Sequence, residues 1–150
     1  ADDGMAPNAT TTALLDVAVL SALLDAASVG DAQAVAAWLD ERGGVDVRYA
    51  ERENMTLLMV VAVAGQEAMV RMLLQRGASV NLQCSLGVTA LMHAAANGRT
   101  TTVQALLNAK ADASLQTNIG YTALMMAERE KHPATAQLLR QHAERRDTAK

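Results

Sequence analysis

The stretch GVTALM at residues 87–92 recurs as GYTALM at residues 120–125, at an offset of 33 residues. Moving back by the same offset reaches NMTLLM at residues 54–59. Gly65 and Gly98 are also 33 residues apart. Self-similarity at a fixed period of about 20–50 residues is the sequence signature of a repeat architecture. The fold is therefore set by a unit that recurs every 33 residues, and not by any single segment.

Each unit carries the pattern of two short helices. A threonine precedes each apolar stretch, where its side-chain oxygen can cap free backbone N–H groups; these residues are Thr56, Thr89 and Thr122. The next apolar residues have the i, i+3, i+4 spacing of a buried helical stripe, in the sets Leu58, Val61, Ala62 and Leu91, Ala94, Ala95. Gly65 and Gly98 then end the first helix. A second stripe predicts the second helix, in the sets Val70, Leu73, Leu74 and Val103, Leu106, Leu107.

The period, the Thr-x-Leu start, the mid-repeat glycine and the turn GASVNL at residues 77–82 together resemble the ankyrin-repeat family. The family signature T-P-L-H is changed here, with Ala or Leu in place of Pro and Met in place of His. The resemblance covers roughly residues 20–142. It implies an all-α solenoid of about four helix-turn-helix units joined by β-hairpin-like loops, and at least three such units are normally needed to bury a continuous core.

The expected boundaries follow from this register. A flexible segment at residues 1–9 precedes a repeat domain at residues 10–142, and a polar tail occupies residues 143–150. Residues 10–20 are expected to form a short leading helix. The units are approximately residues 20–50, 51–83, 84–116 and 117–142. Two extra residues separate the glycines of the first unit, so its second helix or the exit from that helix is expected to be longer.

The last unit is expected to cap the array. It has Glu128 where earlier units have Ala62 and Ala95, and Arg140 where Leu107 would be expected. Lys131 stands in the place of the mid-repeat glycine. Polar residues at these places predict an end that faces water, since terminal units of a solenoid need a polar outer face.

Composition agrees with a thin core between helices. Hydrophobic residues make up 51% of the chain, which excludes global disorder, yet there is no Phe and only one Trp. Ala, Leu, Val and Met must therefore fill the interior. Met59, Met92 and Met125 fall at equivalent places, so we expect them to pack in the core rather than to bind metal. The single cysteine, Cys84, excludes an intrachain disulfide and a cysteine-rich zinc site.

The sequence shows no catalytic pattern. His93, His132 and His142 are the only histidines, and none has the spacing of a metal-binding or nucleophile motif. His93 is expected to be a surface or hydrogen-bonded structural residue, and Cys84 an ordinary loop residue. The glycines are spaced by the repeat rather than by the geometry of a phosphate-binding loop. We therefore predict no enzyme activity, no cofactor and no metal.

The family resemblance implies that partners are held by the hairpin tips and the inner helix face. Carried over to this chain, the partner-binding residues on the tips are Arg52, Glu53, Met55, Leu86, Val88, Ile119 and Tyr121, and those on the inner helices are Asn97 and Arg129. Several tip residues are apolar without serving a core stripe, as interaction sites often are. The alternative is that they pack against neighbouring hairpins. Tyr121 is the preferred anchor, since Tyr is enriched at interface hot spots.

The leading hypothesis is a protein–protein interaction module. A permanent structural subunit of a larger assembly and a non-catalytic regulator of an enzyme are the alternatives. A transient module is expected to be a monomer. The ten basic residues after residue 70 are not clustered as nucleic-acid binding requires. The longest uncharged apolar run, residues 57–64, is too short to span a membrane.

The compartment is less constrained by the sequence. A cytoplasmic location is expected. The chain begins with Ala1, and an Ala-Asp-Asp start is also what removal of a secretory signal would leave. A periplasmic, secreted or organellar location is therefore the alternative.

Overall fold

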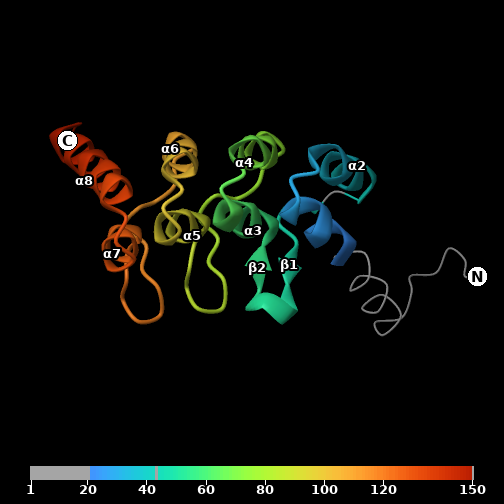
Figure 1. Cartoon of the computed structure of the whole chain (residues 1–150), viewed down its shortest axis with the longest axis horizontal. Coiled ribbons are helices and arrows are strands. Elements are labelled where there is room, and N and C mark those ends of the chain that lie inside the picture. Colours follow the sequence, from blue (N-terminus) through green and yellow to red (C-terminus); the bar gives the residue numbers. More distant parts are fainter. Residues whose placement is uncertain (1–20, 43, 150) are drawn as a thin grey trace, which may run out of the picture.

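The computed structural model describes residues 21–42 and 44–149, which form a row of helix pairs (Figure 1). The expected flexible segment and leading helix, residues 1–20, lie outside the described residues. A helical segment at residues 21–28 pairs with α2 (Ala32–Arg42). The next pairs are α3 (Leu57–Ala64) with α4 (Glu67–Gln75), α5 (Ala90–Ala96) with α6 (Thr100–Asn108), and α7 (Ala123–Arg129) with α8 (Pro133–Ala149). The all-α repeat fold of about four helix pairs is confirmed.

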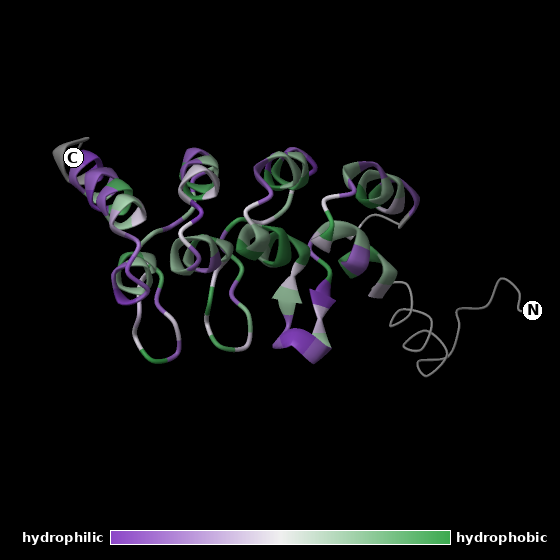
Figure 2. Cartoon of the chain, in the orientation of Figure 1, coloured by the Kyte–Doolittle hydropathy of each residue, from purple (hydrophilic) through white to green (hydrophobic). Residues whose placement is uncertain are grey.

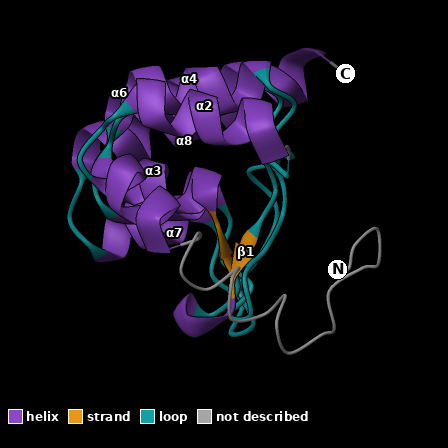
Figure 3. Ribbon diagram, turned by 90° about the vertical axis from the view of Figure 1, so that its right-hand side faces the viewer, coloured by secondary structure: helices purple, strands orange, loops and turns teal. Residues whose placement is uncertain are grey.

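The helices form two layers, and the connecting loops project from them to one side (Figure 3). In the inner layer α5 packs between α3 and α7, and in the outer layer α6 packs between α4 and α8. The loop before α3 is a hairpin of β1 (Arg48–Tyr49) and β2 (Met55–Thr56), with a 3-10 turn, η1 (Ala50–Arg52), after β1. The strands are antiparallel, with Arg48 opposite Thr56 and Tyr49 opposite Met55.

The threonines begin the inner helices as expected. The Oγ1 atom of Thr56 accepts a hydrogen bond from the backbone N–H of Met59 at 3.3 Å, and Thr89 and Thr122 cap α5 and α7 in the same way. In return, the backbone N–H of Thr56 donates to Sδ of Met59 at 3.3 Å, and that of Thr89 to Sδ of Met92 at 3.4 Å. The methionine that replaces the family histidine thus completes a reciprocal cap, although thioether sulfur is a weak acceptor.

The predicted stripes form one continuous core. Leu58, Val61 and Ala62 of α3 are buried, as are their counterparts on α5, and Leu106 of α6 is completely buried. Met59 and Met92 are each 1% exposed. Met125, also expected in the core, is 46% exposed, so that expectation was wrong. The following inner helix covers this position in α3 and α5, and no further inner helix follows α7 in the described chain.

The polar end cap is confirmed and is internally paired. Glu128 and Arg140 are both exposed, and Nη2 of Arg140 lies 2.7 Å from Oε2 of Glu128. Residues 143–149 of the polar tail continue α8, which ends at Ala149. At the other end, α2 has 11 residues whereas α4 and α6 have 9 each, so the two extra residues lengthen the second helix of the first unit.

A series of polar side chains ties each unit to the one before it. The side chains of Gln66, Arg99 and His132 hydrogen-bond to carbonyl oxygens of the preceding unit, on Ser28 at 2.9 Å, Val63 at 3.1 Å and Ala96 at 3.0 Å. Two of these side chains pass close to the Cα atom of a glycine in the preceding unit. A Cβ added to Gly98 would lie 2.6 Å from Nδ1 of His132, and one on Gly65 would lie 2.6 Å from Cδ of Arg99. These glycines therefore leave room for the inter-unit bonds.

Lys110 adopts a left-handed backbone conformation, with φ of 72°, where the preceding unit has Gly77 with φ of 92°. This conformation costs a residue with a Cβ about 1–2 kcal/mol, offset in part by the entropy that glycine loses on folding. We expect Lys110→Gly to raise the free energy of unfolding by about 0.5–1 kcal/mol in urea melts. The matched reverse change, Gly77→Lys, should lower it by a similar amount. A destabilised Lys110→Gly variant would contradict this account.

Candidate functional site

The loops before α3, α5 and α7 are joined to one another at their tips. The backbone N–H of Ser85 donates to the carbonyl of Glu53 at 2.7 Å, and that of Asn118 donates to the carbonyl of Leu86 at 3.0 Å. The side chain of Asn118 also donates to the carbonyl of Ser85 at 2.8 Å. These bonds place Glu53, Leu86 and Ile119, which are 33 residues apart in sequence, in one row across adjacent tips. We call these three residues the tip row.

The tip row changes from charged to apolar along the array. Glu53 is exposed at the tip of the β1–β2 hairpin, whereas Leu86 is 55% exposed and Ile119 is 74% exposed. Figure 2 shows the first tip in hydrophilic colours and hydrophobic stretches in the next two loops. The predicted apolar tip residues are therefore brought together and face water in two of the three loops.

The residues just before the capping threonines behave differently. Met55 and Val88 are half-buried and pack against the core. The expectation that Val88 lies off the core was wrong. An apolar residue immediately before a helix N-cap commonly packs onto the first turn of that helix, which fixes the direction in which the chain enters the helix. Met55, Val88 and Tyr121 all hold this position. Met55 and Val88 thus support the base of their loops, whereas Tyr121 is not among the residues packed against the core.

Tyr121 and Arg129 are in contact. The guanidinium carbon of Arg129 lies 5.3 Å from the centroid of the Tyr121 ring, within the range of a cation–π interaction. Arg129 is the last residue of α7 and is exposed, and Tyr121 is half-buried. Among the described residues Arg129 forms no ion pair. Two predicted site residues thus form a single cationic feature beside the third loop.

Arg52 and Asn97 lie on the same array but take local roles. Asn97 is the exposed C-cap of α5, and its Nδ2 atom donates to the carbonyl of His93 at 2.8 Å. Arg52 is exposed at the end of η1. Burial raises the pKa of the nearby Tyr49 to about 12, and the positive charge of Arg52 acts in the opposite direction. No described side-chain contact joins Arg52 or Asn97 to Leu86 or Ile119.

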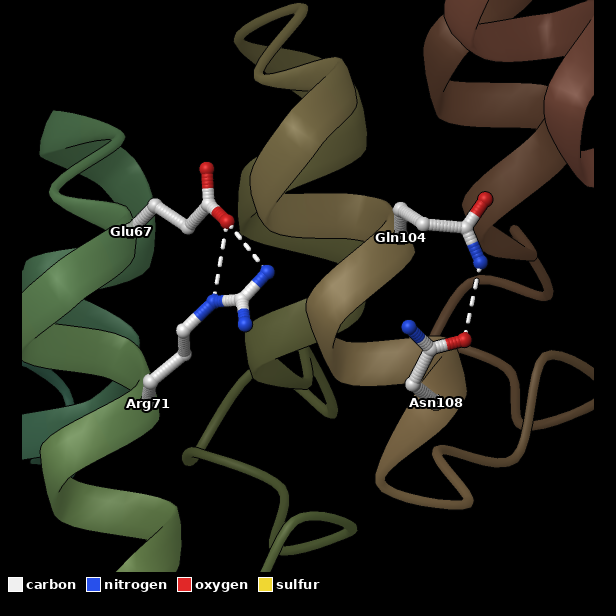
Figure 4. A network of polar contacts seen from close by, with 4 residues as sticks. All are labelled: Glu67, Arg71, Gln104 and Asn108. Atoms are coloured by element: carbon white, nitrogen blue, oxygen red, sulfur yellow. Dashed lines mark hydrogen bonds and ion pairs between the residues drawn. The ribbon is translucent and has the colours of Figure 1, made fainter.

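The outer helices present a different surface, on which polar side chains satisfy one another. Figure 4 shows Nε of Arg71 donating to Oε2 of Glu67 at 2.9 Å on α4, and Gln104 donating to Asn108 at 2.9 Å on α6. The large hydrophobic side chains described as exposed are Val29, Leu86, Ile119 and Met125, and none of them lies on α4 or α6. These two pairs on α4 and α6 are therefore satisfied within the chain, and neither helix exposes a large hydrophobic side chain.

The described histidines and the cysteine do not form a recognisable reaction centre. Cys84 lies in a loop, as expected, and is buried. His93 was expected on the surface or hydrogen-bonded, and this was wrong: it is half-buried and its Nε2 atom has no described hydrogen-bond partner. Burial lowers the pKa of His93 from 6.5 to about 4.

Other kinds of site are also not seen in the described chain. A hollow of about 450 Å³ lies at the α7–α8 turn, between Glu128, Lys131, His132, Pro133, Ala136 and Arg140. His132 already uses its Nε2 atom to reach Ala96 there. Within residues 21–42 and 44–149, no three His, Cys, Asp or Glu side chains gather as metal ligands. No helix in that part of the chain is long and apolar enough to cross a membrane.

Comparison with known families agrees with the repeat. The family model described as "Ankyrin repeats (3 copies)" matches residues 77–148, and the model described as "Ankyrin repeat" matches residues 53–85. No curated protein matches the chain. Repeats of this kind generally serve as protein–protein interaction modules and are generally non-catalytic.

Proposed function

The chain belongs to the ankyrin-repeat family, and we propose on that basis that it is a module that binds a protein partner across its loop tips and inner-helix ends. The observation that carries this proposal is the exposure of Leu86 and Ile119 on two tips that are hydrogen-bonded side by side. Neither side chain is needed to bury the core. Apolar side chains that face water in a row offer free energy of burial to a partner.

The proposed surface has a centre and a rim. Leu86, Ile119 and Tyr121 form the centre, with Met55 and Val88 supporting the loops from below. Arg52, Glu53, Asn97 and Arg129 supply the polar rim, and all four are exposed. A central apolar and aromatic cluster surrounded by polar groups is the usual anatomy of a binding hot spot. The binding surface is proposed to be used by a monomer in transient complexes.

The proposal includes the cytoplasmic location that the sequence predicts. Cys84 is buried and unpaired, as is common in reducing compartments.

A double variant, Leu86→Ala with Ile119→Ala, should weaken partner capture at least about tenfold, because hot-spot truncations cost about 2 kcal/mol or more. The partner would first be identified by affinity capture from the source cells and mass spectrometry, and its Kd would then be measured against both chains. Because both side chains are exposed, the melting curve should be nearly unchanged.

The matched control is Gln104→Ala with Asn108→Ala on the outer face, which should leave the Kd unchanged. If the Leu86/Ile119 variant binds as tightly as the parent chain, the partner site lies elsewhere. If it unfolds, these side chains serve packing instead. Size-exclusion chromatography of the parent chain should show a monomer, and a stable oligomer would favour the permanent-subunit alternative.

A further inference from the structure

We infer that the partner presents an extended segment in which a carboxylate follows or precedes an apolar side chain by about three residues, the carboxylate binding Arg129 and the apolar side chain covering Leu86 and Ile119. This inference rests on the proposed function and adds the chemistry of the partner. It starts from the cationic feature formed by Arg129 and Tyr121, which the fold itself does not use as an ion pair.

Arg129 is held in position before any partner arrives. Its guanidinium lies over the Tyr121 ring at 5.3 Å, while the neighbouring Glu128 is already paired with Arg140 at 2.7 Å. The planar guanidinium can donate two parallel hydrogen bonds to one carboxylate. A side chain that is already placed by a ring loses less conformational entropy on binding than a free one. The feature is therefore a prepared receptor for a carboxylate.

The local charge favours an anionic group at this end of the array. Glu130 and Lys131 follow Arg129 in the chain, and the three together carry a net charge of +1. The first hairpin is different, since Glu51 and Glu53 lie exposed there beside Arg52. A polyanion running along the whole tip row would meet these carboxylates. A single carboxylate next to an apolar group would not, which favours a protein segment over a nucleic acid.

The spacing follows from the loop geometry. Ile119 lies two residues before Tyr121, so their Cα atoms are at most about 7 Å apart. The guanidinium of Arg129 lies a further 5.3 Å from the Tyr121 ring. The chain turns at Gly120, which has φ of 88°, so the span from Ile119 to the guanidinium is shorter than the sum of these two lengths. An extended segment advances about 3.3 Å per residue and crosses such a span in about three residues.

A library of random short peptides panned against the full chain tests this chemistry. Enriched peptides should combine an apolar residue with Asp or Glu about three residues away. Labelled copies of these peptides should bind Arg129→Gln about tenfold more weakly than the parent chain in fluorescence anisotropy, with Arg129→Lys intermediate, since Lys keeps the charge but not the planar fork. Peptides with Asn or Gln in place of the acidic residue should bind the parent chain and Arg129→Gln equally.

The variants distinguish a failure of the proposed function from a failure of this inference about the chemistry of the partner. Peptides that lose affinity for the Leu86→Ala, Ile119→Ala variant but bind Arg129→Gln normally would overturn this inference and leave the proposed function standing. If every enriched peptide binds the Leu86/Ile119 variant as tightly as the parent chain, both the proposed function and this inference are contradicted. Melting curves of Arg129→Gln should match those of the parent chain, because the Arg129 side chain is exposed and is in no described ion pair.

Discussion

Leu106→Ala is expected to lower the free energy of unfolding by about 2–5 kcal/mol, the range for truncating a fully buried leucine. Leu106 is completely buried in α6, which packs against α5 of its own unit and against α4 and α8 of the neighbouring units. The truncation leaves a cavity among helices of three units, so little of it can close by local movement. In a stacked array, stability depends on such interfaces between neighbouring units.

Urea unfolding followed by circular dichroism measures this effect. Leu86→Ala is the matched control, since it removes the same atoms from an exposed tip, and its cost should stay within about 0.5 kcal/mol. A loss below about 0.5 kcal/mol for Leu106→Ala would mean that the assumed helix register is wrong. If one unit unfolded separately from the others, the dependence of the unfolding free energy on urea concentration would also change.

Most of the fold could be predicted because the same pattern of capping and buried residues recurs in each unit. A threonine before an apolar i, i+3, i+4 stripe is sufficient to predict an N-cap and a buried face, and Thr89 with Leu91 shows both. The same period places Leu86 beside Ile119, since residues at equivalent places in adjacent units become neighbours. The tip row therefore follows from the register.

The errors came from positions where the period does not determine the surroundings. Met125 occupies the same place as Met92, but burial there depends on whether another inner helix follows. Val88 lies outside the helical stripe, yet the position before an N-cap packs against the helix it precedes. In both cases the residue type and spacing fit the repeat, but burial depends on which segment packs against the residue, and the spacing does not indicate that.

Contacts made by long side chains were also missed. Arg129 and Tyr121 were both predicted for the site, but nothing in their spacing indicates that the guanidinium lies over the ring. The bonds from Gln66, Arg99 and His132 to the preceding units had a signal in the sequence. Each of the last three units has a long polar residue just after the place of its mid-repeat glycine. Residues at equivalent places in different units can thus have the same structural role even when they are different amino acids. A search for identical residues does not find such a role.

The array should lose stability in mild acid through His93. Burial lowers the pKa of His93 from 6.5 to about 4, and no described group accepts a hydrogen bond from Nε2 when that atom is protonated. The unfolded chain therefore binds a proton more readily than the folded chain. The stabilisation is complete above the unfolded pKa of 6.5 and is lost as pH falls toward about 4. A difference of this size corresponds to about 3 kcal/mol over the whole window.

Between about pH 7 and about pH 5, roughly 2 kcal/mol of this should be lost, measured as a fall in the urea midpoint. His93→Leu should remove that part of the pH dependence, whatever it does to stability at neutral pH. His142 acts in the same direction, since partial burial and then the charges of Arg146 and Arg145 lower its pKa, so His142→Gln is the comparison.

Asp112 does not contribute to the loss of stability expected between about pH 7 and about pH 5. Hydrogen bonds from Ser114 lower its pKa from 3.8, so its contribution is lost only at lower pH. If His93→Leu and the parent chain lose stability in parallel between about pH 7 and about pH 5, the proton enters elsewhere and His93 is better hydrated than its burial indicates.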